Sequence, residues 1–139
     1  MAQIQFFSEQ IKFSVPNPRK TSSWIKAAVK KEKATLESIN YIFCSDDYLR
    51  TLNIHYLKHK TYTDIITFNY GSKGIIEGDI YISVDRIKEN AEKFTVDFNS
   101  ELRRVIIHGV LHLLGYNDKS KTEKALMRKK EDSYLSLWS

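Results

Sequence analysis

Residues 105–114 read Val-Ile-Ile-His-Gly-Val-Leu-His-Leu-Leu, and this run constrains the fold more than any other part of the chain. A helix that is apolar on all sides has to be surrounded by protein. The sequence therefore predicts a central, buried helix over residues 100–114, with Asp97 or Asn99 as its N-cap. The other elements have to be arranged around this helix.

Two histidines interrupt the apolar run, and their spacing places both on one helix face. Residues four apart on a helix are neighbours, so His108 and His112 can reach the same point. Gly115 can end the helix, because glycine adopts the left-handed backbone found at helix C-termini. The chain then reverses and returns Asp118 toward the histidines. Three ligands and one open position are typical of a catalytic zinc site rather than a structural one.

Strands and helices alternate in the first half of the chain, and the second half is mostly helical. Ser45, Ser83 and the pair Ser120 and Glu123 are N-terminal capping signals for helices. Strands are predicted over residues 3–7 with a continuation at 11–13, and over 36–44, 64–70 and 78–83; helices are predicted over 24–33 (capped by Ser22 or Ser23), 46–57, 84–94, 100–114 and from 121 onward.

The order of these elements predicts an α+β fold in a single domain spanning residues 1–139. The last two strands flank a turn at residues 71–74 and are expected to pair antiparallel. The predicted architecture is a small mixed four-stranded sheet covered by about five helices, with the apolar metal-binding helix in the centre.

Composition excludes several classes of protein. No apolar run approaches the roughly 20 residues of a membrane span, and no secretory signal is visible. Cys44 is the single cysteine, so no intrachain disulfide forms, and we expect it in the core of a cytoplasmic protein. The formal net charge of +5 permits a polyanionic partner without requiring one.

The segment at residues 58–63 mixes cations, an aromatic ring and hydroxyl groups, a combination that suits phosphate and base contacts in single-stranded RNA. Lys58, His59, Lys60 and Thr63 are therefore candidate RNA-binding residues, and a solvated loop is the alternative. His55, by contrast, is expected at the surface or in packing. Asp64, Asp79 and Asp85 stand at strand ends, where each is a candidate to orient a ligand histidine.

Three ordered motifs resemble the YbeY family of metal-dependent endoribonucleases, which mature ribosomal RNA. The family pattern His-Gly-x-Leu-His-Leu-x-Gly-Tyr-x-His matches from His108 through Tyr116. Leu52-Asn53 with Tyr56, followed by residues 63–68, is similar to the second motif, and residues 78–82 are similar to the third. The resemblance implies one zinc ion per chain, ribosomal RNA as substrate rather than DNA, and the small ribosomal subunit or assembly factors as partners.

The chain departs from the family pattern at two positions. The third ligand is usually histidine in the family and is Asp118 here, a residue type that also binds zinc. The family often has an arginine associated with catalysis directly after the tyrosine of its second motif, where this chain has Leu57. The catalytic residue is therefore unassigned, with Lys58 and His59 as candidates to replace that arginine.

Three other functions share parts of this pattern. Zinc metallopeptidases carry a glutamate as general base directly after the first histidine, where this chain has Gly109. Two histidines and a carboxylate also describe the iron site of some oxygenases, whose usual β-barrel is not predicted here. The third alternative is a metal-stabilised ribosome-assembly factor that binds RNA without cutting it.

Overall fold

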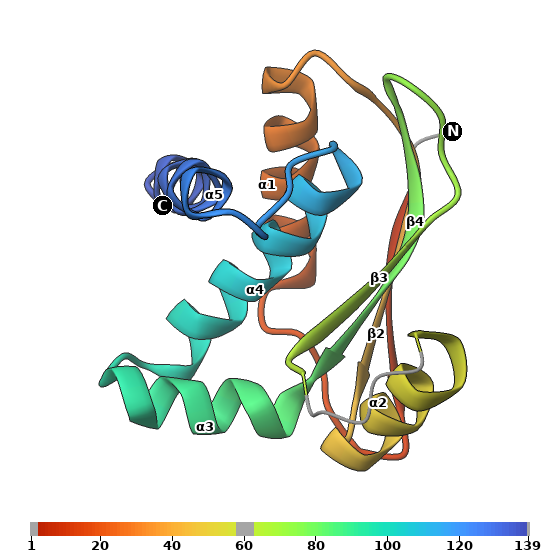
Figure 1. Cartoon of the computed structure of the whole chain (residues 1–139), viewed down its shortest axis with the longest axis vertical. Coiled ribbons are helices and arrows are strands. Elements are labelled where there is room, and N and C mark those ends of the chain that lie inside the picture. The colour runs from red at the N-terminus through yellow and green to blue at the C-terminus, as the bar shows by residue number, and fades with distance from the viewer. Residues whose placement is uncertain (1–2, 58–62, 139) are drawn as a thin grey trace.

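The computed structural model describes residues 3–57 and 63–138, in which a four-stranded sheet stands beside a layer of helices (Figure 1). The order across the sheet is β1-β2-β4-β3, with β1, β2 and β4 parallel and β3 antiparallel to β4. The predicted mixed sheet and its antiparallel pair are therefore confirmed. The strands are β1 (Gln3–Glu9), β2 (Thr35–Cys44), β3 (Ile65–Asn69) and β4 (Ile75–Ser83).

The helices cover the two faces of the sheet unequally. α1 and α4 pack on one face, α2 packs on the other, and α4 lies between the sheet and α5 (Figure 1). The apolar helix is therefore central, as the sequence predicts. The helices are α1 (Pro18–Lys31), α2 (Asp46–Leu52), a π-helical turn η1 (Asn53–Leu57), α3 (Val84–Phe94), α4 (Phe98–Leu113) and α5 (Lys121–Leu135).

Gly109 allows α4 to approach the sheet closely. A Cβ atom at this position would lie 3.0 Å from side-chain atoms of both Ile65 and Ile80, a separation tighter than ordinary van der Waals contact. The face of α4 that carries Gly109 is therefore pressed onto β3 and β4. His108 and His112 lie at the margin of this contact, and their side chains are 21% and 24% exposed.

The predicted capping residues act as expected at four helices. The Ser45, Ser83 and Asp97 side chains accept hydrogen bonds from the first turns of α2, α3 and α4, so Asp97 rather than Asn99 caps the apolar helix. Ser120 and Glu123 form a reciprocal capping box at α5. Cys44 is fully buried, and burial with the nearby acids Asp85 and Asp46 raises the pKa of its thiol to about 12, so it stays protonated.

Two boundaries in the N-terminal part differ from the prediction. α1 begins at Pro18, earlier than the expected Ser22 or Ser23 cap, because proline is favourable in a first helical turn that needs no donor from it. The preceding Asn17 has a left-handed backbone (φ 50°) and makes no side-chain cap. β1 runs on to Glu9, and residues 11–13 are not a strand but pack partly buried against the core.

α5 is fixed against α1 by both tryptophans of the chain. The indole N–H of Trp24 donates to the Tyr134 carbonyl at 2.8 Å, and the ring of Trp138 meets that of Trp24 edge to face at 5.4 Å between centroids. The charged groups of Lys20 and Arg103 lie over the ring of Trp138. These contacts fix the position of α5 relative to α1. Among the described residues, no helix has the length and apolar character needed to cross a bilayer.

Candidate metal centre

Three side chains from α4 and the loop after it converge on one point. The Nε2 atoms of His108 and His112 are 3.0 Å apart, and one oxygen of Asp118 lies 3.3 and 3.4 Å from them. The left-handed Gly115 (φ 104°) reverses the chain after α4, as its place in the sequence predicts, and this reversal brings Asp118 back.

The spacing of these donor atoms fits a zinc ion. Tetrahedral ligands at Zn–N and Zn–O distances near 2.0–2.1 Å stand about 3.3–3.4 Å apart from one another. The separations between the three donors are close to this value. Two neutral imidazoles and one carboxylate are also a donor set that zinc accepts in catalytic sites. The Asp118 side chain is 40% exposed, so its carboxylate is accessible to solvent.

Glu131 of α5 contacts the ring nitrogen of His108 that faces away from the converging donors. Its carboxylate lies 2.6 Å from His108 Nδ1 and 2.8 Å from the Arg104 guanidinium, although the side chain is only 6% exposed. Burial lowers the pKa of His108, but the hydrogen bond and the charges of Glu131 and Asp118 outweigh it and raise the pKa above its usual value. A proton on Nδ1 directed at Glu131 leaves the Nε2 lone pair available to an ion.

The pKa of His112 shifts in the opposite direction to that of His108. Burial and the neighbouring His108 lower the pKa of His112, so this imidazole stays neutral at lower pH than an exposed one. Burial raises the pKa of the Asp64 carboxyl, and the charge of His108 partly offsets this rise. The two imidazoles therefore differ in how readily they release a proton, with His112 the more acidic.

The loop that carries Asp118 is held by Glu32, just after the end of α1. The Tyr116 hydroxyl donates to the Glu32 carboxylate at 2.5 Å, and the same carboxylate accepts from the Tyr134 hydroxyl and, at 3.0 Å, from the Lys130 ammonium. Burial raises the pKa of Glu32, but these three donors lower it below its usual value overall. α1, the ligand loop and α5 are thereby joined at one acidic side chain.

Comparison with known proteins now identifies the family. A family model described as Endoribonuclease YbeY matches residues 3–139. This chain belongs to the YbeY endoribonuclease family. The match spans α4, with His108, Gly109 and His112, together with the rest of the described fold.

Several YbeY relatives are similar over almost their whole length. Endoribonuclease YbeY of Amoebophilus asiaticus is 48% identical over 135 residues, which cover 96% of this chain and 92% of the relative. The protein of the same name from Cytophaga hutchinsonii is 49% identical over 135 residues, covering 96% and 94%. The solution structure of TM1509 from Thermotoga maritima superposes with a TM-score of 0.68 at 28% identity, covering 96% of this chain and 87% of the other.

Position 109 also separates this YbeY protein from metallopeptidases in structural terms. The peptidase motif requires a glutamate directly after the first histidine. Here position 109 is a glycine whose added Cβ would press on Ile65 and Ile80 at 3.0 Å. The chain therefore has no general base at this position, and a glutamate there would crowd the contact between α4 and the sheet.

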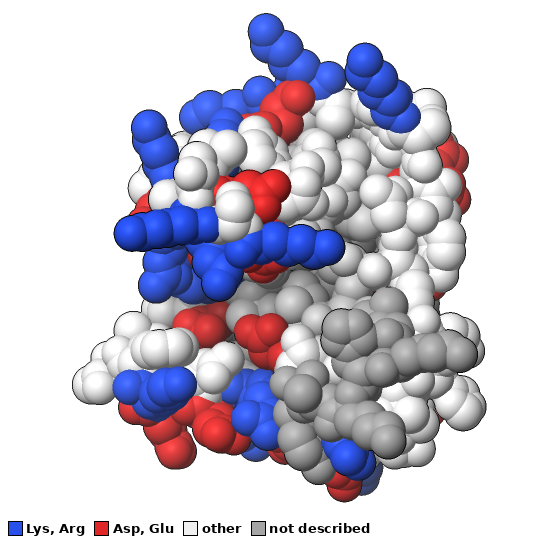
Figure 2. Space-filling view, viewed as in Figure 1, with Lys and Arg blue, Asp and Glu red and all other residues white. Residues whose placement is uncertain are grey.

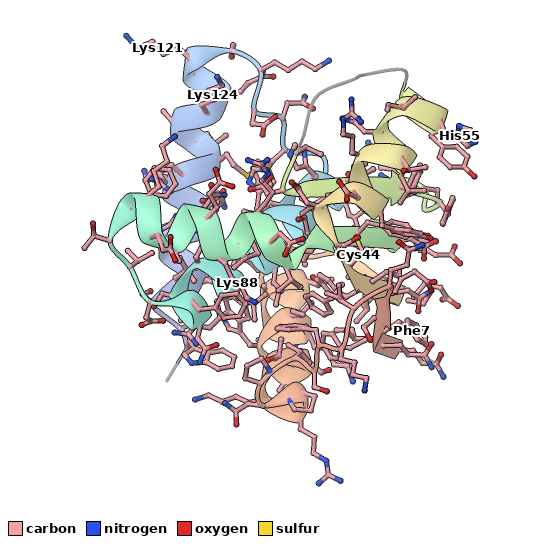
Figure 3. All side chains as sticks on the ribbon, turned by 90° about the horizontal axis from the view of Figure 1, so that it is seen from below. Phe7, Cys44, His55, Lys88, Lys121 and Lys124 are labelled. Carbon is pink, nitrogen blue, oxygen red and sulfur yellow. The ribbon has the colours of Figure 1, made fainter. Side chains whose placement is uncertain are left out.

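Several candidate residues are not part of the described metal centre. Lys58, His59 and Lys60 lie outside the described residues, and the Thr63 hydroxyl donates to the Ile65 carbonyl at 3.3 Å. His55 is exposed and points away from the helices that form the metal centre (Figure 3). The assignment of Lys58, His59, Lys60 and Thr63 to RNA binding stays a prediction, whereas His55 is at the surface as expected.

The residue that orients His108 was not among those expected from the sequence. Asp79 accepts from Asn40 and Tyr70, and Asp85 accepts from the Asp46 backbone N–H, so both of these acids are engaged elsewhere. Glu131 is the acid that contacts His108 instead. The sequence feature that could have indicated this is its place on one face of α5 with Met127 and Tyr134, all three of which are buried. An acid inside an apolar helical stripe needs a buried partner.

Proposed function

We propose that this protein is a zinc-dependent endoribonuclease that cleaves single-stranded RNA during ribosomal RNA maturation, with His108, His112 and Asp118 holding one ion. The observation that carries the proposal is the convergence of three donor atoms, at separations that fit zinc, in a member of an endoribonuclease family. Ribosomal RNA, the small ribosomal subunit and its assembly factors are the proposed partners, and the cytoplasm is the proposed location.

The chain's own residues set how strongly the site acts on RNA. When bound, zinc lowers the pKa of water and polarises a phosphoryl oxygen. Asp118 contributes a negative charge that a third histidine would not, so the ligand set reduces the formal charge of the ion from +2 to +1. Glu131 holds the ring of His108 in place. Cations near the site have to supply more of the phosphate stabilisation, and Lys58 and His59 remain the candidates for this catalytic role.

RNA cleavage by the purified protein is the decisive test. We expect the zinc-loaded chain to cut a single-stranded ribosomal RNA fragment, and His112→Ala to reduce the rate to background. His55→Ala is a matched control, because His55 is an exposed histidine outside the metal centre. A wild-type protein that binds this RNA without cutting it would instead support an assembly factor, the alternative that Leu57 favours because the family's arginine is missing there.

Replacing Asp118 with histidine is expected to move the pH optimum of cleavage downward. Histidine is neutral, so the ion would keep its full charge and make nearby water more acidic. The pH–rate profiles of Asp118→His and the unaltered protein would be compared at saturating zinc. An upward shift, or loss of the ion from the variant, would show that Asp118 is not a ligand of this kind.

Neutralising Lys58 and Lys60 is expected to weaken RNA binding and its salt dependence together. Each lost phosphate contact on a single strand reduces the log–log salt slope by about 0.7, so the double Lys→Gln variant should lose about 1.4. Fluorescence anisotropy with single-stranded RNA at several salt concentrations would measure this slope, with zinc content expected to stay unchanged. An unchanged slope would mean that Lys58 and Lys60 do not contact the RNA and belong to a solvated loop.

A further inference from the structure

A cavity of about 670 Å³ lies where the end of α1, the turn between β3 and β4 and the end of α4 meet. Figure 1 places both segments and the C-terminal end of α4 toward the top of the molecule. The volume falls within the range of roughly 300–1,000 Å³ usual for small-molecule sites. The third wall of the cavity is residues 113–116, the stretch that links His112 to Asp118.

The lining of the cavity divides into an apolar floor and a basic rim. Ala34, Ile76 and Leu113 contribute to the floor, and Lys33 and Lys73 stand in the lining from opposite sides, on the α1 end and on the β3–β4 turn. Within residues 3–57 and 63–138, neither ammonium group is paired with an acid. Figure 2, from the same side, shows Lys and Arg side chains at the upper edge around an uncharged surface.

The acid in the cavity wall does not cancel this basic character. Glu32 lines the cavity, but its carboxylate already accepts hydrogen bonds from Tyr116, Tyr134 and Lys130. Its negative charge is thereby compensated within the protein. An apolar floor with two lysines at the rim matches a nucleotide, whose base has an apolar face and whose phosphate is anionic.

A short stretch of chain joins the cavity to the three converging donors. Tyr116 lies two residues before Asp118, a span of at most about 7 Å along the chain. Gly115, which precedes Tyr116 in the lining, is exposed, and an added Cβ there would touch nothing within 4 Å. The lining is therefore open at Gly115.

We propose that this cavity is a subsite for one nucleotide of the RNA strand flanking the cleaved phosphodiester bond. The base lies on the floor, and Lys33 and Lys73 contact the adjoining phosphate. This inference rests on the proposed ribonuclease function and adds where the substrate strand runs. Cleavage should accordingly need a nucleotide at this position, and a shorter RNA that leaves the cavity empty should react more slowly.

Titration of the full chain with adenosine 5′-monophosphate tests the subsite without any cleavage. We expect backbone amide resonances of Gly71, Gly74 and Gly115 to shift in the nuclear magnetic resonance spectrum, and the shifts to weaken in a Lys33→Gln, Lys73→Gln variant. Inorganic phosphate at equal concentration is the comparison. Equal shifts with phosphate alone, or shifts confined to other surfaces, would overturn the nucleotide subsite.

A second measurement uses a single-stranded RNA 12-mer and the His112→Ala background, in which no cutting is expected. Adding Lys33→Gln and Lys73→Gln should weaken binding about tenfold at 0.1 M salt and lower the log–log salt slope by about 1.4. The matched control replaces Lys88 and Lys93 of α3, which lie away from the cavity (Figure 3 labels Lys88).

These outcomes separate the subsite from the enzyme activity. If the Lys33 and Lys73 variant binds RNA as the α3 control does, the subsite is wrong even where the wild type cleaves. If the wild type does not cleave but adenosine monophosphate shifts the three glycines selectively, the proposed ribonuclease activity fails and the nucleotide site stands.

Discussion

A chain with both His108 and His112 replaced by alanine should contain no zinc after purification without chelator, whereas the unaltered chain should carry close to one ion. Two of the three converging donors are then gone, and Asp118 alone offers one partly exposed carboxylate. Elemental analysis of both proteins measures the difference. The ion should also stabilise the fold, by about 4 kcal/mol when zinc is present at 1,000 times its dissociation constant.

Chelation provides the corresponding thermal test. Adding a chelator to the unaltered protein should lower its melting temperature, and the same addition should leave the double variant unchanged. His55→Ala should behave like the unaltered protein in both assays, because its exposed imidazole lies outside the converging donors. Equal zinc content in all three proteins would place the ion somewhere else in the chain.

Glu131→Gln should weaken zinc binding by roughly 10–100-fold at neutral pH, the effect typical of losing a carboxylate behind a ligand histidine. Glutamine keeps the shape of the side chain but not the negative charge that faces His108 Nδ1 at 2.6 Å. Competition with a chromophoric chelator measures the affinity. Glu92→Gln is a control of the same chemistry at an exposed position on α3.

The difference between Glu131→Gln and the unaltered protein should shrink as the pH falls. Glu131 raises the pKa of His108, so in the unaltered chain protons begin to compete with zinc at higher pH. Without the carboxylate the pKa of His108 falls, and this competition starts only in more acidic solution. A difference in affinity that grows toward low pH would mean that Glu131 does not act through His108.

The parts of the fold that follow from local chemistry could be predicted from the sequence. The Ser45, Ser83 and Ser120 caps, the Gly115 reversal and the central place of the apolar helix depend on residues close together in the chain. The predicted start of α1 was wrong because Ser22 and Ser23 are weaker signals for the start of a helix than Pro18 in the first turn. The π-helical turn over Asn53–Leu57 has no equivalent local signal.

The candidate site also combines contacts that are local in the sequence with contacts between distant segments. His108, His112 and Asp118 lie within one short segment, and so their convergence could be anticipated from spacing. Glu131 and Glu32 act on that segment from 23 and 84 residues away, measured to His108 and Tyr116, and only the docking of α5 and α1 brings them there. Sequence spacing carries no information about such contacts between distant segments.

The contact between Trp24 and Trp138 gives the protein a built-in optical reporter. These are the chain's two tryptophans, and both stand where α5 meets α1. Their emission therefore depends on the same docking that carries Glu131 to His108. Intrinsic fluorescence during refolding follows the arrival of the last helix, and comparison with the rate of zinc uptake shows whether the ion binds before or after its support is in place.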